Sequence, residues 1–577
     1  MSTAEDEVEF SLKVMINKEK TKVLFAEADS DFADVLLSFL ALPLGTMVRL
    51  FKKHYGDKAP VFGSLNSLRK GLANLDNVHL WREGGKMMLL NPRSSLEDEF
   101  CKLKLNVYDA QPTKYFTCED LNCKLTRAEN VSMFCYAKTC YCGKSMNREI
   151  GLQEESDTGA ATNNDHGVFT TKKMSFFISD DLRMVPNTMT GSIIQTLENL
   201  GISETYGAEQ RIVSLGFNEI MDLLRLSLLS ETPLTELVLH KKLVLHKRKM
   251  DYPTAKSELN FIKDFSAISL HHKKMIVKVM IQKSTNKLLF AQAEEDFVDF
   301  LFSFLTIPLS RAESLLDANT SLRSIDNLYR SLTNINGEKC LKSEDTKNRL
   351  LKPNLPPMFL SKYQIFPITE QTTPELYYYL HTEDYLCTYD TYRNTKVRLK
   401  DPKGEGSYVK GPTMFLVSDD LTVTPLCMLS SLSILNELKI PLGDVKEVEL
   451  HIGLEEALSI LRASLTSTCA LTEGLMNNPI LNKQSKEEHV NPPRRGGRWR
   501  RAKPCRGPLY IIVDLRLSGL QLMHKEVQNA QNLLRQVPQN DSDADRVLET
   551  VRSSLSHIAS LVGEEDARQR WTHTEDA

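Results

Sequence analysis

Ser11 to Gly45, SLKVMINKEKTKVLFAEADSDFADVLLSFLALPLG, occurs twice in the chain. Residues Ile276 to Ser310 read IVKVMIQKSTNKLLFAQAEEDFVDFLFSFLTIPLS, aligned without a gap, and 19 of the 35 aligned positions are identical. A duplication of this kind indicates two homologous modules. The length of 577 residues is also too great for a single hydrophobic core.

Each copy begins with two short apolar runs around a polar turn and then changes its period. In the first copy, the runs Leu12 to Ile16 and Val23 to Ala26 predict a β-hairpin. The apolar residues that follow have helical spacing and predict a helix with one buried face: Phe32, Val35, Leu36, Phe39 and Leu40. Residues 29–31 contain the N-cap candidates, and Pro43 is expected to end this helix.

The similarity between the copies returns in later segments, including helical patterns at residues 65–75 and 325–335. We therefore predict an α+β fold with two tandem modules of β-hairpins and amphipathic helices. The expected organisation is a disordered N-terminus at 1–10, a first module at 11–239 with a cysteine-rich insert at 100–167, a connector at 240–273, a second module at 274–476, a basic disordered linker at 477–508 and a helical hairpin at 509–577.

Six of the eleven cysteines fall between Cys101 and Cys142. Two close pairs separated by sixteen residues resemble the arrangement in which a zinc ribbon gathers four thiolates around Zn²⁺: Cys118, Cys123, Cys140 and Cys142. Cys135 is an alternative ligand, and a set of reduced thiols in a β-rich insert is the alternative interpretation. Because four thiolates leave no open coordination position, a bound zinc ion would be structural. The second copy has only Cys387 in the matching region.

Other candidate motifs favour structural roles. Ser179-Asp180-Asp181 and its counterpart Ser418-Asp419-Asp420 lie between apolar runs and predict hairpin turns rather than an acid pair for catalysis. The chain has no Gly-rich phosphate loop, nucleophile elbow or metalloprotease helix motif. We therefore expect no catalytic residues and no enzyme activity.

The strongest local charge lies in the predicted linker. Residues 494–506 carry seven positive charges and no acidic residue, in a chain whose net charge is −3. A nucleic-acid contact would use the basic residues and the tryptophan among them: Arg494, Arg495, Arg498, Trp499, Arg500 and Arg501. The alternative is a solvated linker without a ligand.

Residues 9–476 resemble a plant family known as domain of unknown function 674, whose members often carry tandem copies. The resemblance rests on the opening stretch, on the paired Ser-Asp-Asp-Leu turns and on the closing pattern from Gly453 to Thr472. Related members have a cysteine-rich ribbon at this point of the repeat, which supports the zinc hypothesis. The resemblance implies no biochemical activity and does not extend to the tail after about residue 480.

The first functional hypothesis is a non-enzymatic protein-interaction or scaffold protein with one structural zinc ion and protein partners. The second is a nucleic-acid-associated protein that uses the cysteine ribbon and residues 494–506. The third is an enzyme with a site between the repeats. The N-terminus lacks the features of a secretory signal, and no apolar run approaches the length of a membrane span. We therefore expect an intracellular protein, cytoplasmic or nuclear, without a membrane partner.

Overall fold

A computed structural model describes residues 8–120, 123, 131–134, 139–140, 142–153, 167–172, 174–187, 192–239, 274–379, 385–389 and 394–475. These residues all belong to one compact unit. The predicted connector, basic linker and C-terminal hairpin lie outside the described residues, as do residues 1–7 of the predicted N-terminal segment.

The first half of the chain forms a five-stranded antiparallel sheet. Its strand order is β7-β6-β2-β1-β8, and β1 pairs with both β2 and β8. The strands are β1 (Phe10–Ile16), β2 (Val23–Asp29), β6 (Ser175–Ser179), β7 (Met184–Pro186) and β8 (Glu209–Leu215). Alternate residues of β1 are buried, which is the period-two pattern of a strand with one face on a core.

The second half forms a sheet with the corresponding order, β15-β14-β10-β9-β16. Its strands are β9 (Met275–Gln282), β10 (Lys287–Ala293), β14 (Phe415–Ser418), β15 (Val423–Pro425) and β16 (Val445–Ile452). The hairpins predicted from the repeated stretch are β1-β2 and β9-β10, and both are confirmed. With helices beside two antiparallel sheets, the α+β class is confirmed as well.

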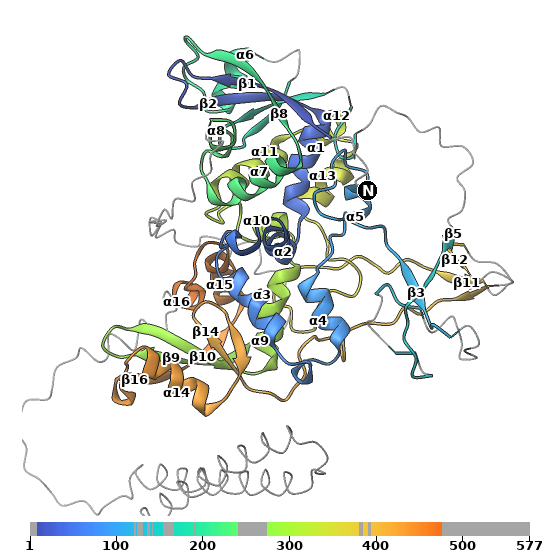
Figure 1. Cartoon of the computed structure of the whole chain (residues 1–577), viewed down its shortest axis with the longest axis vertical. Helices are drawn as coiled ribbons and strands as arrows, with labels where there is room; N and C mark the ends of the chain where they lie inside the picture. Colours follow the sequence, from blue (N-terminus) through green and yellow to red (C-terminus); the bar gives the residue numbers. More distant parts are fainter. Residues whose placement is uncertain are drawn as a thin grey trace, which may run out of the picture. The chain divides into compact units, whose positions relative to one another are not determined.

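Most helices of both halves lie between the two sheets, whereas α6 (Ile193–Asn199) and α14 (Met428–Glu437) lie on the outer sides of the sheets (Figure 1). The other helices of the first half are α1 (Ser30–Ser38), α2 (Leu44–Tyr55), α3 (Leu65–Asn74), α4 (Glu83–Leu90), α5 (Glu97–Phe100), α7 (Phe217–Leu229) and α8 (Pro233–Leu239). Those of the second half are α9 (Glu295–Ser303), α10 (Leu309–Leu315), α11 (Arg323–Asn334), α12 (Gly337–Cys340), α13 (Glu344–Leu351), α15 (Leu454–Thr466) and α16 (Ala470–Leu475). Within the described residues, none of these helices is long and apolar enough to cross a membrane.

The helix of the repeated stretch begins as predicted but ends differently. Asp29 is the N-cap of α1, and its side chain accepts a hydrogen bond from the backbone amide of Phe32 at 2.9 Å. The α-helix ends at Ser38 and continues as a short 3₁₀ helix to Ala41. Pro43 therefore does not itself end the helix; it precedes α2, a helix that the sequence analysis did not predict.

The helices after each repeated stretch pack on the opposite half of the chain. Helix α3 contacts β15 and α9, whereas α11 contacts β7 and α7. The hydroxyl of Ser64 donates to the carbonyl oxygen of Ser467 at 2.6 Å, and the hydroxyl of Ser324 donates to that of Ser230 at 2.9 Å. Contacts that come in reciprocal pairs are what a two-fold relationship between two copies produces.

The repeated stretches also meet directly. The Leu44 amide donates to the Ile307 carbonyl at 2.9 Å, and the Leu309 amide donates to the Leu42 carbonyl at 2.9 Å. One hydrophobic core includes buried residues of both halves, among them Phe39 and Phe304. The two halves therefore share a core instead of each enclosing its own.

A separate small β-structure forms from the segments in which the copies diverge. In one sheet, β5 (Leu152–Gln153) of the first half pairs with β12 (Tyr385–Cys387), next to β11 (Tyr377–Tyr379) and β13 (Asn394–Lys396). The two strands β3 (Tyr115–Thr117) and β4 (Arg148–Ile150) form a second, antiparallel pair. A second hydrophobic cluster combines side chains of both halves: Tyr115, Val131, Met133, Ile150, Leu376, Tyr378 and Leu386.

Gly63 marks a close approach between the halves and provides a test of it. Its φ is +49°, and an added Cβ would lie 2.1 Å from the backbone oxygen of Ser464. We expect Gly63→Ala to lower the free energy of unfolding by roughly 2–5 kcal/mol, from about 1–2 kcal/mol of left-handed strain and about 1–3 kcal/mol of overpacking. Gly56 is the matched control, because its φ is +58° and no atom lies within 4 Å of the added Cβ.

Denaturant unfolding of both variants measures the difference. Gly56→Ala should lose only a backbone contribution, about 1–3 kcal/mol for a residue with φ of +58° and ψ of −125°. Equal losses in the two variants would contradict the close contact between Gly63 and α15.

Candidate metal centre and adjoining cavity

The first cysteine pair lies in a turn that leaves strand β3. Cys118 directly follows β3, and its sulfur accepts a hydrogen bond from the Asp120 backbone amide at 3.4 Å. The amide of Cys123 donates to the carbonyl of Asp120 at 3.1 Å and closes this turn. The Glu119 amide bonds to the Ser145 carbonyl at 2.9 Å, which ties this turn to the second cysteine pair.

The second pair lies in a tight turn between Thr139 and Ser145, which form an antiparallel bridge. The Cys140 amide donates to the Lys144 carbonyl at 2.7 Å, and the Gly143 amide donates to the Cys140 carbonyl at 2.9 Å. Gly143 has a φ of +84°, a conformation that glycine adopts without steric cost. The turn therefore directs Cys140 and Cys142 toward the first pair.

The four sulfur atoms lie within 4.8 Å of one another. The Sγ atoms of Cys118 and Cys142 are 3.5 Å apart, and those of Cys123 and Cys140 are 3.6 Å apart. These distances are far longer than the roughly 2.05 Å of a disulfide. They are close to the spacing of about 3.8 Å that four sulfurs take around an ion bound at about 2.3 Å.

The surroundings of the sulfurs differ across the cluster. Cys118 and Cys140 are buried, together with the fully buried Met146, while Cys142 is exposed. Burial raises the pKa of the Cys118 thiol to about 12 and also raises that of Cys140. A hydrogen bond from the Lys144 backbone amide lowers the pKa of Cys142 to about 7.

The four thiols could hold a metal ion. They are cysteines that the sequence analysis selected, and the structure brings all four together. The alternative ligand Cys135 and the basic residues of 494–506 lie outside the described residues. In the second half, Cys387 is buried in β12.

The Ser-Asp-Asp motifs are hairpin turns, as predicted, with a further structural role. Residues 179–183 connect β6 to β7, and Leu182 has a φ of 60°. Asp180 also accepts hydrogen bonds from the amide and hydroxyl of Thr235, at 2.8 and 2.7 Å. In the second half, Asp419 makes the same two contacts with Thr472. The first aspartate of each motif therefore joins the sheet to the last helix of its half.

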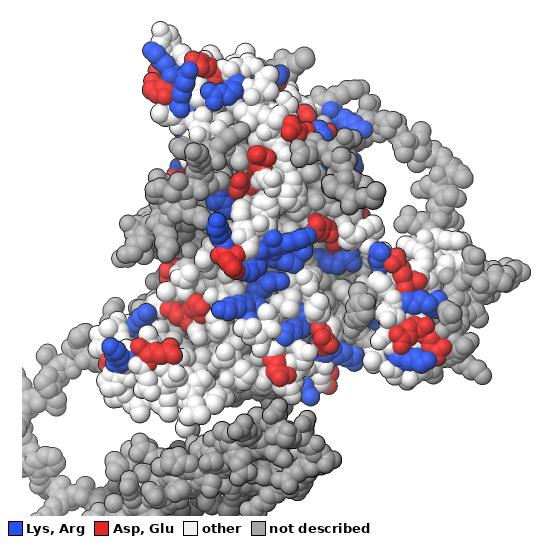
Figure 2. Space-filling model, in the orientation of Figure 1, with Lys and Arg blue, Asp and Glu red and all other residues white. Residues whose placement is uncertain are grey.

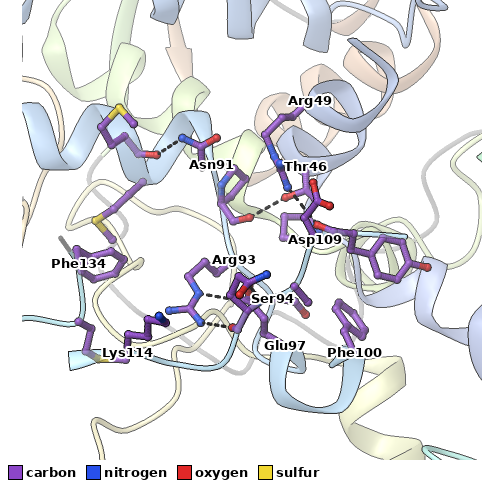
Figure 3. Close-up of a pocket in the computed structure, with 18 of the residues that line it drawn as sticks. Thr46, Arg49, Asn91, Arg93, Ser94, Glu97, Phe100, Asp109, Lys114 and Phe134 are labelled. Atoms are coloured by element: carbon purple, nitrogen blue, oxygen red, sulfur yellow. Dashed lines mark hydrogen bonds and ion pairs between the residues drawn. The ribbon is translucent and has the colours of Figure 1, made fainter. Parts of the chain in front are cut away.

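A cavity of about 400 Å³ lies between helices α2 and α4 and the start of the cysteine-bearing insert (Figure 3). Apolar side chains from α4 and from the insert line part of it: Met87, Met88, Phe116, Met133 and Phe134. Phe116 lies in β3, two residues before Cys118. The wall of the cavity and the cysteine cluster therefore belong to the same small β-structure.

Charged side chains line the rest of the cavity. Among its carboxylates, Glu97 pairs with Arg93 at 2.5 Å, and Asp109 pairs with Lys53. Arg49 donates one hydrogen bond, a long one of 3.4 Å from Nη2 to the Tyr108 carbonyl oxygen. Its buried Nε has no partner among the described residues.

This cavity was not predicted from the sequence. A signal existed, because Arg49 corresponds to Ser314 when the ungapped alignment of the repeats is continued. The second copy forms the same fold with an uncharged serine at this position, so the fold itself does not require the charge of Arg49. The contact of Arg49 with the Tyr108 carbonyl could not be predicted from the spacing of the residues.

The described residues define an α+β protein with a four-cysteine site that could hold a metal ion. Over residues 6–453 the chain matches the model of a family described as "Protein of unknown function (DUF674)", and it belongs to this family. The family resemblance drawn from the sequence is thereby confirmed. Comparison with curated proteins found no match, nor did comparison with solved structures.

Proposed function

We propose that the protein is a non-enzymatic binding or scaffold protein in which one structural zinc ion orders the insert of the first half. The observation that carries the proposal is the spacing of the four cysteine sulfurs. Four thiolates at tetrahedral spacing are a ligand set that zinc prefers, and they fill every position of a four-coordinate ion. Such an ion stabilises a fold and offers no open position for a substrate.

A zinc ion would stabilise the insert, a part of the chain that has few other stabilising contacts. The insert has short strands of two or three residues, and it shares only a small hydrophobic cluster with the second half. Metal binding supplies folding free energy to small domains of this kind. Ordering of the insert would also position Phe116, Met133 and Phe134, which line the cavity.

Exposed apolar residues on a helix support a role in binding a protein partner. Helix α14 exposes 69% of Met428 and 73% of Leu429, and Leu442 after it is 66% exposed. Apolar side chains that gather on a surface mark sites of protein association more often than sites of catalysis.

Metal analysis of the purified full chain tests the zinc site. We expect about one zinc per chain, because one set of four thiolates binds one ion. Cys140→Ser should lower the zinc content by more than half and make the insert more sensitive to limited proteolysis. Cys427→Ser is the matched control, since Cys427 is a free, exposed cysteine outside the cluster.

Two results would overturn the proposal. One is less than half an equivalent of zinc in the unmutated protein, and the other is an unchanged zinc content in Cys140→Ser. Iron in place of zinc would reject the identity of the ion while leaving the four-sulfur site in place, because both metals accept tetrahedral sulfur ligands.

A further inference from the structure

The cavity beside α2 combines an uncompensated positive charge with an apolar wall. Its volume of about 400 Å³ lies in the range of small-molecule sites. Figure 3 shows Arg49 and Asp109 on one side, with Phe134 and Lys114 farther along the cavity. The chemistry of a ligand therefore depends on which of these charges already have partners.

Of the three cations among the described residues that line the cavity, Arg49 is the one with no carboxylate partner among those residues. Arg93 pairs with Glu97, and Lys114 pairs with Glu149 at 2.9 Å. Among the described residues, Arg49 has only the Tyr108 carbonyl as a hydrogen-bond acceptor. Arg49 is half-buried, and its guanidinium, whose Nε is buried without an acceptor, would be stabilised by a ligand that supplies a negative charge.

A second guanidinium adds to the local positive charge. Arg69 of α3 donates to the Leu90 carbonyl at 3.1 Å, and its buried Nε also lacks a partner among the described residues. Burial lowers the pKa of Arg69, and the nearby charge of Arg49 lowers it further. Arg69 does not itself line the cavity, but its charge adds to the positive potential beside Arg49.

The surface around the two arginines is basic as well. Figure 2 shows Lys and Arg side chains gathered in a band where Figure 1 places α2 and α3. Lys52 and Lys53 of α2 and Lys70 of α3 are exposed cations on these helices. A basic surface around the mouth of a cavity raises the local concentration of anionic ligands.

We propose that this cavity binds a small organic anion, with a carboxylate or phosphate group on Arg49 and an apolar body against Met87, Phe116 and Phe134. Arginine suits this role because its planar donors match both groups bidentately. The site belongs to the first half alone, since Ser314 occupies the corresponding position in the second.

Calorimetric titration of the full chain with three naphthalene probes tests the proposal. The probes are 1-naphthyl phosphate, 1-naphthoate and the neutral 1-naphthalenemethanol, which share one ring system. We expect at least one of the two anions to bind about one per chain and at least tenfold more tightly than the neutral probe. The ratio between phosphate and carboxylate identifies the preferred anion.

Variants separate the charge from the apolar wall. Arg49→Met should weaken the bound anion roughly tenfold or more and leave the neutral probe unchanged. Lys278→Met removes an exposed positive charge from β9, in the other half of the chain, and should change neither affinity by more than about twofold. Met87→Trp, at a position that is 52% exposed, should weaken all probes by filling the cavity without loss of the fold.

The outcomes decide the proposal. Equal binding of anionic and neutral probes would reject an anion site, as would full anion affinity in Arg49→Met. Unchanged binding of every probe in Met87→Trp would place their binding outside this cavity. If Arg49→Met does not fold, the comparison among the three probes and the Met87→Trp variant still gives the answer.

Discussion

Two fragments that divide the chain within the predicted connector, residues 1–256 and 257–577, should fold only when they are produced together. Alone, each fragment should aggregate or unfold without a cooperative transition. Together, they should purify as a one-to-one complex that unfolds in one cooperative step. The reason is that α3 and α11 each pack on the sheet of the opposite half, and that the two halves share one hydrophobic core.

Several backbone hydrogen bonds connect the two halves next to their shared hydrophobic core. Amides and carbonyls of residues 42–44 pair with those of residues 307–309. The Trp81 amide donates to the Tyr408 carbonyl at 3.0 Å, and the Lys342 amide donates to the Phe169 carbonyl at 2.9 Å. A fragment that lost its partner would leave such backbone groups and the shared core exposed to water.

Size-exclusion chromatography and thermal unfolding of the separate and co-expressed fragments provide the measurement. Full-length protein carrying a protease site after residue 256 is the control, because cleavage after folding should leave the halves together. Independent cooperative unfolding of either fragment, without association, would show that the packing between the halves is not needed for folding.

Two buried aspartates at equivalent positions should respond in opposite ways to the same substitution. We expect Asp34→Asn to lower the free energy of unfolding by about 2–4 kcal/mol. We expect Asp299→Asn to be at least as stable as the unmutated protein at pH 7. The two residues lie in α1 and α9, and their partners explain the difference.

Both carboxylate oxygens of Asp34 accept hydrogen bonds from backbone amides. Oδ2 accepts from Val168 at 2.6 Å, whereas Oδ1 accepts from Phe169 at 3.1 Å and Thr170 at 2.8 Å. An asparagine must turn its NH₂ group toward one of these donors. A buried amide then loses its acceptor, which costs more than an ordinary hydrogen bond contributes.

Asp299 offers an arrangement that an asparagine can reproduce. Its Oδ2 accepts the amides of Tyr408 at 2.6 Å and Val409 at 2.8 Å, and its Oδ1 accepts from the Ser361 hydroxyl. An asparagine oxygen can take the place of Oδ2, and its NH₂ can donate to the hydroxyl oxygen. Both backbone amides then keep their acceptor and the new NH₂ gains one, so that only the Ser361 hydroxyl hydrogen has to turn to another acceptor.

The pH dependence of Asp299 follows from its burial. Burial raises the pKa of this carboxyl to about 6, although hydrogen bonds to Ser361, Val409 and Tyr408 act against the rise. Since the pKa of an unfolded aspartate is about 3.9, the folded state holds this proton more tightly, and its contribution to stability is lost as the pH rises from about 4 through 6.

Denaturant unfolding between pH 4 and pH 7 measures this effect. Relative to the unmutated protein, Asp299→Asn should gain up to about 3 kcal/mol over this interval, because it has no proton to lose. Burial also raises the pKa of Asp34, so its contribution changes in the same direction. Equal destabilisation by both substitutions at pH 7 would contradict the assigned hydrogen bonds.

Local elements of this protein could be predicted because their signals are short-range. The alternation in Phe10–Ile16 and the helical spacing after Asp29 are set by strand and helix geometry. The cysteine pairs were also visible, since two turns suffice to bring each pair into position. The helix α2 was missed because it follows Pro43, which was interpreted as an end rather than a beginning.

The roles of Asp34 and Arg49 could not be predicted from the sequence, because they depend on tertiary contacts. The partners of Asp34 lie more than 130 residues away, so its helical position indicated only a buried polar residue. The role proposed for Arg49 likewise depends on Tyr108 and Arg69, which only the tertiary structure brings close to it. Neither residue stands out by spacing, because a helix pattern specifies a face and not what lies against it.

The amino-acid sequence by itself determined the duplication, the main hairpins, the helix that begins after Asp29 and the cysteines that could hold a metal ion. Only the tertiary structure decided that α3 and α11 pack on the opposite halves, and that a cavity lined by Arg49 forms beside the insert. Local geometry repeats identically in two similar copies, whereas packing depends on which surfaces of the two copies meet.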